Sequence, residues 1–283
     1  MSTLFVVATP IGNLNDLSLR AKTVLASVDL VAAEDTRVTA RLLSHLGIKV
    51  PQTALHEHNE KNKTAELIKT LKSGNSVALV SDAGTPLISD PGFRLIKSAH
   101  EEGITVSPIP GPSALIAAVS SSGLPTNRFV FEGFLPVRNE ARKKRLQNLK
   151  HERRTIVFFE SVHRITEMIG DMIIVLGGDR NAAIGRELTK LHEQCLAADL
   201  NTLAEGLASG SIPEKGEFVI VVEGSSADSP QGIEVDLLFH ELIDALPGKQ
   251  AVDIVARVTG LKRNDLYKKM LEIKNNSGPD RPK

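Results

Sequence analysis

The sequence predicts an α/β protein with two α/β domains followed by a small helical module. Three observations lead to this prediction. The first 125 residues alternate short apolar runs with amphipathic segments, which indicates strands and helices around a mainly parallel sheet. Further strand candidates follow at irregular spacing, as expected for a mixed sheet. After a stretch rich in Gly and Ser the pattern is helical, so we place the domains at residues 1–123, 124–224 and 233–274.

Each of the five strands expected in the first domain is followed by an expected helix. The strands are Leu4–Ala8, Asp29–Ala33, Thr53–His56, Ser76–Val80 and Ile104–Pro108. Gly47, Gly74 and Gly103 mark helix ends, because glycine just past a helix is a common stop signal. The helix after the fourth strand is expected to begin with Asp90 as its N-cap and Pro91 in its first position.

The second domain is expected to contain four strands and three helices. The strands are Phe129–Phe131, Thr155–Phe159, Ala182–Arg186 and Glu217–Val222, and the helices lie at about 140–150, 162–176 and 203–209. Charged segments at 158–164, 185–190 and 213–217 adjoin three of these strands. Taken singly, each segment is better explained by structural ion pairing than by a functional site.

The loops at the carboxyl ends of the first five strands share an unusual composition. They are small, polar or ionisable, and they comprise 9–14, 34–37, 56–59, 81–86 and 110–113. Ligands of doubly wound sheets bind beyond this edge. The fourth connection, VSDAGTPLISDPG, exceeds the usual length of about 2–6 residues, and Gly84 in it allows a close approach of main chain. Five such loops on one edge favour a ligand site over solvation alone.

Several familiar sites are missing from the sequence. It contains no G-x-G-x-x-G after the first strand, no G-x-x-x-x-G-K-[ST], no H-E-x-x-H and no G-x-S-x-G. His56 and His58 are better explained as hydrogen-bonding or surface residues than as metal ligands, so we expect no metal. Cys195 is the single cysteine; we expect it to be buried in a protein of the reducing cytoplasm. The longest apolar run, Ala114–Val119, is too short to span a bilayer.

Basic residues concentrate in two places although the formal net charge is +0. Residues 138–154 hold eight Lys or Arg against two Glu, and the spacing Ala256-x₃-Gly260-x₅-Leu266 predicts a basic helix-turn-helix near the end of the chain. Both places are candidates for phosphate contact, and solvated helix faces are the alternative. The candidate residues for contact with nucleic-acid phosphates are Arg138, Arg142, Lys143, Lys144, Arg145, Lys262, Arg263, Lys268 and Lys269.

The motifs taken together resemble those of one family. TPIGNL, AAEDTR, LHEHNE, VSDAGTPLISDPG, PGPSA, EGFLP, FFESVHR, GRELTK and KGEFVIVVEG occur in the order found in bacterial small-subunit ribosomal RNA 2′-O-methyltransferases of the tetrapyrrole methylase superfamily. The resemblance extends from Leu4 to about Lys274. It implies two α/β domains of the tetrapyrrole methylase type with S-adenosylmethionine in the cleft between them, and a homodimer. It also implies methylation of a cytidine ribose 2′-hydroxyl in the decoding region of 16S rRNA.

The same resemblance assigns residues to the cofactor and to the chemistry. The cofactor would be held by Pro10, Gly12, Asp82, Ala83, Gly84, Thr85, Ser113, Ala114, Glu160, Ser161, Leu188 and Gly216. A ribose hydroxyl holds its proton tightly, so a base or a cation that stabilises the developing alkoxide should help. Candidates for the base are His58, Asp35 and Glu34, and candidates for the cation are Lys215, which would also face the cofactor, and Arg37.

Two other functions remain open from the sequence. The substrate could be a tetrapyrrole of the precorrin type, although members of that branch usually carry a G-P-G-D type first loop where this chain has TPIGNL. The protein could also be a nucleic-acid-binding regulator that keeps an inert ligand domain. The polar loops at the five strand ends argue against an inert domain.

Overall fold

The computed structural model describes residues 2–226, 235–243, 245–259 and 261–276. The chain forms two compact units: Met1–Gln147 with Arg154–Glu223, and Asn148–Arg153 with Gly224–Lys283. Most of the expected linker and the expected turn residue Gly260 lie outside the described residues. The first unit contains both β-sheets, so the expected domain boundary near residue 123 stays a prediction.

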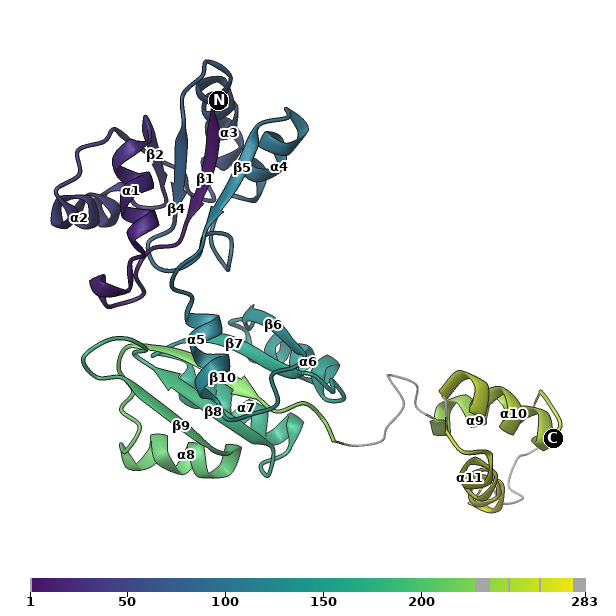
Figure 1. The fold of residues 1–283 in the computed structure, drawn as a ribbon. Helices are drawn as coiled ribbons and strands as arrows, with labels where there is room; N and C mark the ends of the chain where they lie inside the picture. Colours follow the sequence, from purple (N-terminus) through teal and green to yellow (C-terminus); the bar gives the residue numbers. More distant parts are fainter. Residues whose placement is uncertain (1, 227–234, 244, 260, 277–283) are drawn as a thin grey trace. The chain divides into compact units, whose positions relative to one another are not determined.

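The N-terminal sheet of the first unit is entirely parallel (Figure 1). Its strand order is β3-β2-β4-β1-β5. The strands are β1 (Thr3–Val7), β2 (Leu30–Ala33), β3 (Gln52–Ala54), β4 (Val77–Val80) and β5 (Thr105–Ile109). The predicted parallel α/β arrangement is therefore confirmed, with strand ends that differ from the expected ones by one or two residues.

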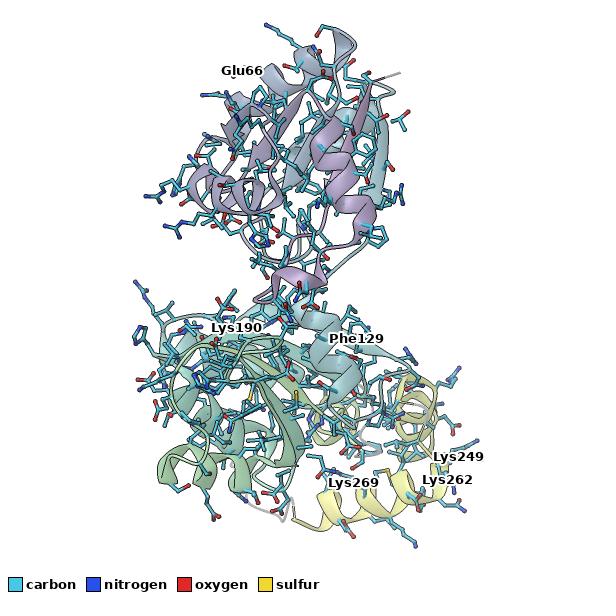
Figure 2. The ribbon with its side chains drawn as sticks, turned by 60° about the vertical axis from the view of Figure 1, so that its left-hand side comes forward. Glu66, Phe129, Lys190, Lys249, Lys262 and Lys269 are labelled. Carbon is cyan, nitrogen blue, oxygen red and sulfur yellow. The ribbon has the colours of Figure 1, made fainter. Side chains whose placement is uncertain are left out.

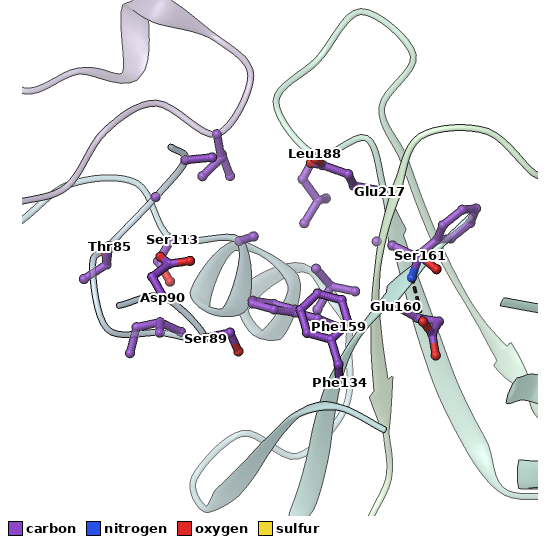
Figure 3. A pocket seen from close by; sticks show the side chains of 18 residues that line it. Thr85, Ser89, Asp90, Ser113, Phe134, Phe159, Glu160, Ser161, Leu188 and Glu217 are labelled. Atoms are coloured by element: carbon purple, nitrogen blue, oxygen red, sulfur yellow. Dashed lines mark hydrogen bonds between the residues drawn. The ribbon is translucent and has the colours of Figure 1, made fainter. Parts of the chain in front are cut away.

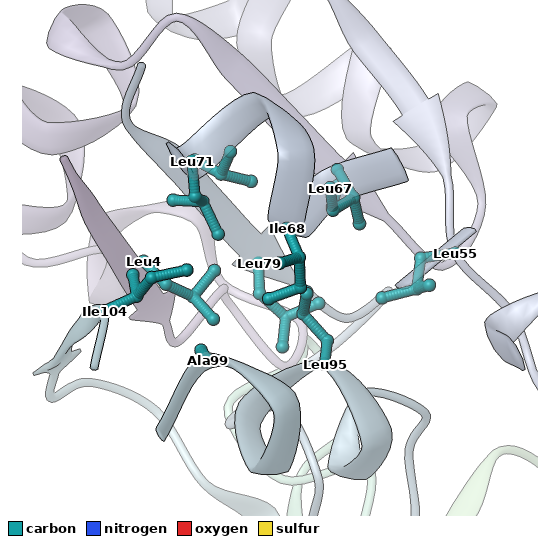
Figure 4. Close-up of a cluster of buried hydrophobic side chains, with 11 residues drawn as sticks. Leu4, Leu55, Leu67, Ile68, Leu71, Leu79, Leu95, Ala99 and Ile104 are labelled. Carbon is teal, nitrogen blue, oxygen red and sulfur yellow. The ribbon is translucent and has the colours of Figure 1, made fainter. Parts of the chain in front are cut away.

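Helices cover both faces of this sheet. They are α1 (Leu19–Ser27), α2 (Thr36–Leu46), α3 (Glu60–Lys72) and α4 (Phe93–Glu101), with the 3-10 turn η1 (Leu14–Asp16) before α1. On one face of the sheet, Leu25 of α1 and Leu43 of α2 lie in one core cluster. On the opposite face, Leu71 of α3 and Leu95 of α4 lie in a second core cluster with Leu79 of β4 (Figure 4). Helices α1 and α4, which follow the neighbouring strands β1 and β4, thus lie on opposite faces, which makes this the topological switch point of the sheet.

The start of α4 differs from the sequence-based prediction. The helix begins at Phe93 with Gly92 as its N-cap, and not with Asp90 as expected. Gly92 has φ 127°, and a Cβ there would lie 2.8 Å from Cδ2 of Leu79. The backbone N–H groups of Gly92 and Arg94 donate to Oε1 of Glu60, at 3.1 and 2.8 Å. A carboxylate from α3 thus caps α4, because the tightly packed turn leaves Asp90 outside the capping position.

The second sheet of this unit is mixed, as predicted. Its strand order is β6-β7-β10-β8-β9, in which only the β6–β7 pair is parallel. The strands are β6 (Phe129–Phe134), β7 (Thr155–Ser161), β8 (Asn181–Arg186), β9 (Gln194–Asp199) and β10 (Glu217–Val222). The helices are α5 (Ala114–Ser121), α6 (Asn139–Leu149), α7 (Ile165–Leu176) and α8 (Leu200–Ser209).

Helix α5 connects the two sheets in a way that the strand–helix pattern does not suggest. Although it follows β5 of the first sheet, it packs against the second sheet (Figure 1). Leu115 and Val119 of α5 lie in one core cluster with Val157, Ala183 and Val219. The chain therefore leaves the edge of one sheet and enters the core of the other within one short helix.

Strand β9 was not expected from the sequence. Gln194–Asp199, with the sequence QCLAAD, lacks β-branched residues, and it is ordered by antiparallel pairing with β8 at the edge of the sheet. Cys195 lies on this edge strand and is exposed. The expectation that Cys195 is buried is therefore wrong, because an edge strand leaves part of its side chains in solvent.

Arg142 on α6 is another correction, because it cannot serve as an RNA-binding residue. Its side chain is 1% exposed, and its Nε lies 2.6 Å from Oδ2 of Asp171 on α7. A second contact joins its guanidinium to Glu167, 3.2 Å away. Arg142 is on the buried side of α6 with Leu146 and Leu149, four and seven residues further on. Its charge therefore holds α6 to α7.

The second unit is helical. Its helices are α9 (Val235–Ile243), α10 (Gly248–Thr259) and α11 (Arg263–Asn276). They share a core that includes Phe239, Val255 and Leu266, the last residue of the predicted helix-turn-helix spacing. Lys249 and Lys262 are exposed on this unit (Figure 2). In the part of the chain that the structure describes, no helix is long and apolar enough to cross a membrane.

The buried ion pair predicts a specific loss of stability. Arg142→Ala should lower the free energy of unfolding by about 3–5 kcal/mol, because it leaves the Asp171 carboxylate buried without its main partner. Lys144→Ala changes an exposed residue of the same helix and should alter it by less than about 0.5 kcal/mol. Urea unfolding of the two variants tests this. Equal stabilities would contradict the structural role of Arg142.

Candidate functional site

A cavity of about 380 Å³ lies in the first unit, between loops of the parallel sheet and strands of the mixed sheet (Figure 3). One wall comes from the loops after β1, β4 and β5, and the other from β6, β7, β8, β10 and the loop after β8. The lining residues are Ile11, Ala83, Gly84, Thr85, Ile88, Ser89, Asp90, Ser113, Ala114, Phe134, Phe159, Glu160, Ser161, Gly185, Leu188, Glu217, Phe218 and Val219. The cavity therefore lies beyond the carboxyl ends of the parallel strands, as the sequence predicted for a ligand site.

Hydrogen bonds tie the loops of the first wall together. Thr9 and Gly84 exchange two backbone hydrogen bonds, of 2.9 and 3.0 Å, which link the loops after β1 and β4. The buried hydroxyl of Thr9 also donates to the carbonyl of Ser81, at 3.1 Å. The hydroxyl of Thr85 donates to the carbonyl of Pro112 in the loop after β5, at 3.0 Å. Three loops from distant parts of the sequence thus form one wall.

Strained backbone is found on both sides of the cavity. The four non-glycine residues with positive φ in the described chain are Leu87, Ser89, Glu187 and Thr189. The first two lie in the loop after β4 and the last two in the loop after β8, on either side of Leu188. Such conformations cost about 1–3 kcal/mol each and cluster at functional sites. Their positions here support the view that this cavity is the functional site.

The second wall is fixed by two arginines. Glu160 is buried and accepts hydrogen bonds from the Arg164 guanidinium, at 2.7 and 2.8 Å, and from the backbone N–H of Ser161, at 2.7 Å. Arg186 is buried and donates to the carbonyls of Pro213 and Lys215, at 2.9 and 2.7 Å. These contacts hold Ser161 and the chain before β10 in place and use most of the hydrogen-bonding capacity of Glu160.

The rim of the cavity carries a further set of ion pairs. Nζ of Lys190 lies 2.8 Å from Oε1 of Glu187 and 3.0 Å from Oε2 of the lining residue Glu217. The Lys190 side chain also packs on Gly12, where a Cβ would lie 2.3 Å from Cγ of Lys190. Lys190 therefore joins the loop after β8 to the loop after β1.

Carboxylates gather at the carboxyl ends of β2 and β4. Burial raises the pKa of Glu34 and of Asp82, and the two are linked by a 3.3 Å hydrogen bond from the Asp82 N–H to Glu34. Burial, with the charges of Glu34 and Asp82, raises the pKa of Asp90 to about 6. Asp35 behaves oppositely, because hydrogen bonds from Arg37 lower its pKa to about 2.

Most of the residues predicted to hold a cofactor line this cavity. They are Ala83, Gly84, Thr85, Ser113, Ala114, Glu160, Ser161 and Leu188. Pro10 and Asp82 instead line a neighbouring cavity of about 230 Å³ beside α2. Gly12 lies under Lys190, and Gly216 packs against the side chain of Glu187. Sequence reasoning missed Phe134, Phe159 and Asp90, although the motifs EGFLP, FFESVHR and SDPG that contain them were recognised.

The residues predicted to take part in the chemistry lie outside the cavity lining. Glu34 and Asp35 lie just before α2, where the Asp35 N–H donates to Asp82 at 2.9 Å, and Arg37 is exposed. The exposed His58 has its ring centroid 6.0 Å from that of His56. Lys215 contributes its carbonyl to Arg186. Within the described residues, no group of three or more His, Cys, Asp or Glu side chains could hold a metal ion.

The cavity fits an amphipathic, positively charged ligand. Its volume falls in the usual range of about 300–1,000 Å³ for small-molecule sites. Phe134, Phe159 and Leu188 offer apolar surface for a flat ring, and the small residues 83–85 leave main chain accessible (Figure 3). Of the lining carboxylates, Glu160 and Glu217 are paired with Arg164 and Lys190, which leaves the negative charge of Asp90 to complement a cation. These properties suit S-adenosylmethionine, whose sulfonium is positive and whose adenine is flat.

Comparisons with known proteins identify the class of protein first. The family model of Tetrapyrrole (Corrin/Porphyrin) Methylases matches residues 3–204. Uroporphyrin-III-C-methyltransferase from Thermus thermophilus has a similar fold, with a TM-score of 0.53 and 17% identity over 79% of this chain and 94% of that chain. The methyltransferase CobJ gives a TM-score of 0.59 and 18% identity over 81% and 96%. The chain belongs to the tetrapyrrole methylase family.

Closer relatives narrow the family further. The chain is 51% identical over 266 residues to ribosomal RNA small subunit methyltransferase I of Xylella fastidiosa, covering 94% of this chain and 97% of that protein. It is 48% identical over 278 residues to the protein of the same name from Pseudomonas aeruginosa, covering 97% and 99%. The RsmI C-terminal HTH domain model matches residues 229–274. Within the tetrapyrrole methylases, this chain is a member of the ribosomal RNA small subunit methyltransferase I family.

The wall of the cavity predicts an effect on ligand affinity. Gly84 has φ 85°, and a Cβ there would lie 3.2 Å from Cγ2 of Ile11 in the cavity wall. Gly84→Ala should weaken S-adenosylmethionine binding roughly tenfold, because both the backbone and Ile11 must shift. Gly74→Ala is the matched control, since Gly74 has φ 97° and nothing within 4 Å of its Cβ position. Calorimetric titration of both variants tests this, and equal affinities would contradict the role of Gly84.

Proposed function

We propose that this protein transfers a methyl group from S-adenosylmethionine to the ribose 2′-hydroxyl of a cytidine in the decoding region of 16S rRNA. The observation that carries the proposal is the cavity at the strand ends, lined by the residues of the family motifs. The names of the close relatives support ribosomal RNA as the substrate. The apolar and acidic lining supports S-adenosylmethionine as the cofactor.

The residues around the cavity have a positioning role in this proposal. When bound, S-adenosylmethionine supplies a methyl group that is already a strong electrophile. The protein must therefore chiefly align the hydroxyl oxygen with the methyl–sulfur bond. The linked loops at Thr9, Gly84 and Thr85 give one rigid wall for this, and Arg164 and Arg186 fix the other. Rigidity of both walls keeps the reacting groups aligned.

The residues predicted to take part in the chemistry do not line the cavity. His58, a candidate base, and Arg37, a candidate cation, are exposed and lie outside the cavity lining, so their roles stay predictions. Glu34 acts on the cavity through its charge, since it contributes to the raised pKa of Asp90. The roles of Asp35 and Lys215 stay predictions.

Basic residues on two helices are proposed to bind the RNA backbone. Arg138, just before α6, and Lys144 on α6 are exposed, whereas Arg145 pairs with Glu132 at 2.6 Å and Lys143 lies 3.5 Å from Asp171. Around α11 the proposed contacts are Lys262, Arg263, Lys268 and Lys269, and the helix-turn-helix family of this region supports them. We further propose that the protein is a homodimer in the cytoplasm that acts on the small ribosomal subunit.

Transfer of a labelled methyl group tests the proposed function. Unmethylated 30S subunits and free 16S rRNA are incubated with labelled S-adenosylmethionine, and the label is mapped by ribose-sensitive digestion. We expect label on one cytidine 2′-oxygen. Binding of the cofactor without label on either RNA would favour a tetrapyrrole substrate. Binding of RNA without binding of the cofactor would favour the nucleic-acid-binding regulator.

The proposed backbone contacts predict a change in salt dependence. Replacing Arg138 and Lys144 by Gln should weaken RNA binding and lower the slope of log affinity against log salt by about 0.7 for each phosphate that the protein no longer neutralises. Lys22→Gln with Lys61→Gln removes the same charge from exposed positions on α1 and α3. Filter binding at several salt concentrations distinguishes the pairs. An equal weakening in both would mean that only net charge matters.

A further inference from the structure

Asp90 is the residue whose surroundings the proposed function leaves unexplained. It is half-buried and lines the cavity from the loop after β4, as do Thr85 and Ser89 of the same loop and Ser113 (Figure 3). Its sequence context, Asp-Pro-Gly before a helix, is typical of an N-cap residue. The structure gives it no such role, because α4 begins two residues beyond Pro91.

The capping role is filled from another helix. Oε1 of Glu60, on α3, accepts the backbone hydrogen bonds of Gly92 and Arg94 at the start of α4. Glu60 is itself buried, which is an expensive location for a carboxylate without such partners. Glu60 therefore caps α4, and the carboxylate of Asp90 lines the cavity instead.

The loop before Asp90 holds it in a strained but defined position. Leu87 and Ser89 both have positive φ, at 74° and 70°, and Gly92 turns the chain directly after it. A Cβ at Gly92 would lie 2.8 Å from Cδ2 of Leu79 in the core, so the turn requires glycine at this position. Strain of this kind persists only where the surrounding structure enforces it.

Asp90 also differs from the other acidic residues of the cavity in its partners. Three carboxylates line the cavity: Asp90, Glu160 and Glu217. Glu160 is paired with Arg164, and Glu217 with Lys190. Among the residues that the structure describes, Asp90 is the lining carboxylate with no basic partner. An unpaired carboxylate beside a reaction cavity is suited to accept a proton.

We propose that Asp90 is the general base that takes the proton from the ribose 2′-hydroxyl during methyl transfer, an inference that rests on the proposed function. The hydroxyl oxygen forms a bond to the methyl carbon as the carbon–sulfur bond breaks, and the sulfur keeps that electron pair. The O–H bond breaks at the same time, and its proton passes to a carboxylate oxygen of Asp90. The products are the 2′-O-methyl ribose, S-adenosylhomocysteine and neutral Asp90, which then returns its proton to water.

The charged groups around Asp90 adjust its basicity. Glu34 after β2 and Asp82 after β4 raise its pKa beyond the effect of burial, to about 6, while a hydrogen bond with Ser81 acts in the other direction. Glu60 is engaged by the N-terminus of α4, and the carboxylates of the opposite wall are paired with cations. Asp90 is thus ionised near pH 7 but more basic than an ordinary aspartate, which favours proton transfer. Activity should fall as the pH drops through about 6.

The test compares Asp90→Asn with Asp16→Asn, a change at an exposed position on η1. Single-turnover methylation of 30S subunits is measured at saturating cofactor between pH 5.5 and 8.5, and S-adenosylmethionine binding by calorimetry. Asp90→Asn should lower the rate about 100-fold or more and remove the pH dependence near 6, with cofactor affinity within threefold of wild type. The Asp16 variant should match wild type in both.

Two results would overturn the assignment. A rate within threefold of wild type would exclude Asp90 as the base, and a loss confined to cofactor affinity would make it a counter-charge for the sulfonium. Wild-type protein that methylates no RNA would instead reject the proposed function, and this inference with it.

A measurement on the free protein checks the same residue without turnover. With ¹³C-labelled aspartate, one side-chain carboxyl should titrate near pH 6 in wild type and be missing in Asp90→Asn. Because the pKa of Asp90 is higher in the folded state than in the unfolded state, the free energy of unfolding falls as the pH rises toward 6. Asp90→Asn should therefore raise the melting temperature more at pH 7.5 than at pH 4.5. If the Asp90 carboxyl titrates near pH 4 and the variant shows no extra gain in melting temperature at pH 7.5, its surroundings do not raise its basicity.

Discussion

The reciprocal pair of backbone hydrogen bonds between Thr9 and Gly84 is the constraint on which the site depends. It joins the loops after β1 and β4, the two neighbouring strands whose helices leave toward opposite faces of the sheet. Without such a link, the divergence of these loops would leave an open crevice. With it, and with the Thr85 to Pro112 hydrogen bond, the crevice has one continuous wall. The small residues 83–85 allow the backbone of the loop after β4 to come within hydrogen-bonding distance of the loop after β1.

Helix α5 extends this constraint to the second sheet. It begins at the cavity with Ala114 and then buries Leu115 and Val119 in the core of the mixed sheet. A displacement of the first wall would therefore disturb apolar packing in the second half of the unit. Protein interiors resist such displacement because they are close-packed. The cavity owes its shape to this shared core as much as to the loops themselves.

The acidic residues of the site divide into two groups with different physical roles. Glu60, Glu160 and Asp35 are engaged by backbone N–H groups or arginines, and they fix the geometry of loops and helix ends. Asp90 and Glu34 lie where burial and neighbouring negative charge raise their pKa values. The lowered pKa of Asp35 means that its ionised form stabilises the fold, whereas burial disfavours the ionised forms of Asp90 and Glu34. Perturbed pKa values of this kind cluster at functional sites.

The sequence alone determined the strand–helix order, the parallel sheet, the positions of the five polar loops and the motifs of the family, because these depend on local apolar patterns and turn residues. Eight of the twelve residues that the family resemblance assigned to the cofactor line the cavity. What local pattern could not reveal depended on partners far away in the chain. Glu60 caps a helix 32 residues away, Asp171 makes Arg142 a buried residue 29 positions before it, and β9 is a strand because β8 pairs with it. In each case a long-range contact outweighed the local preference, and only the tertiary structure brings those partners together.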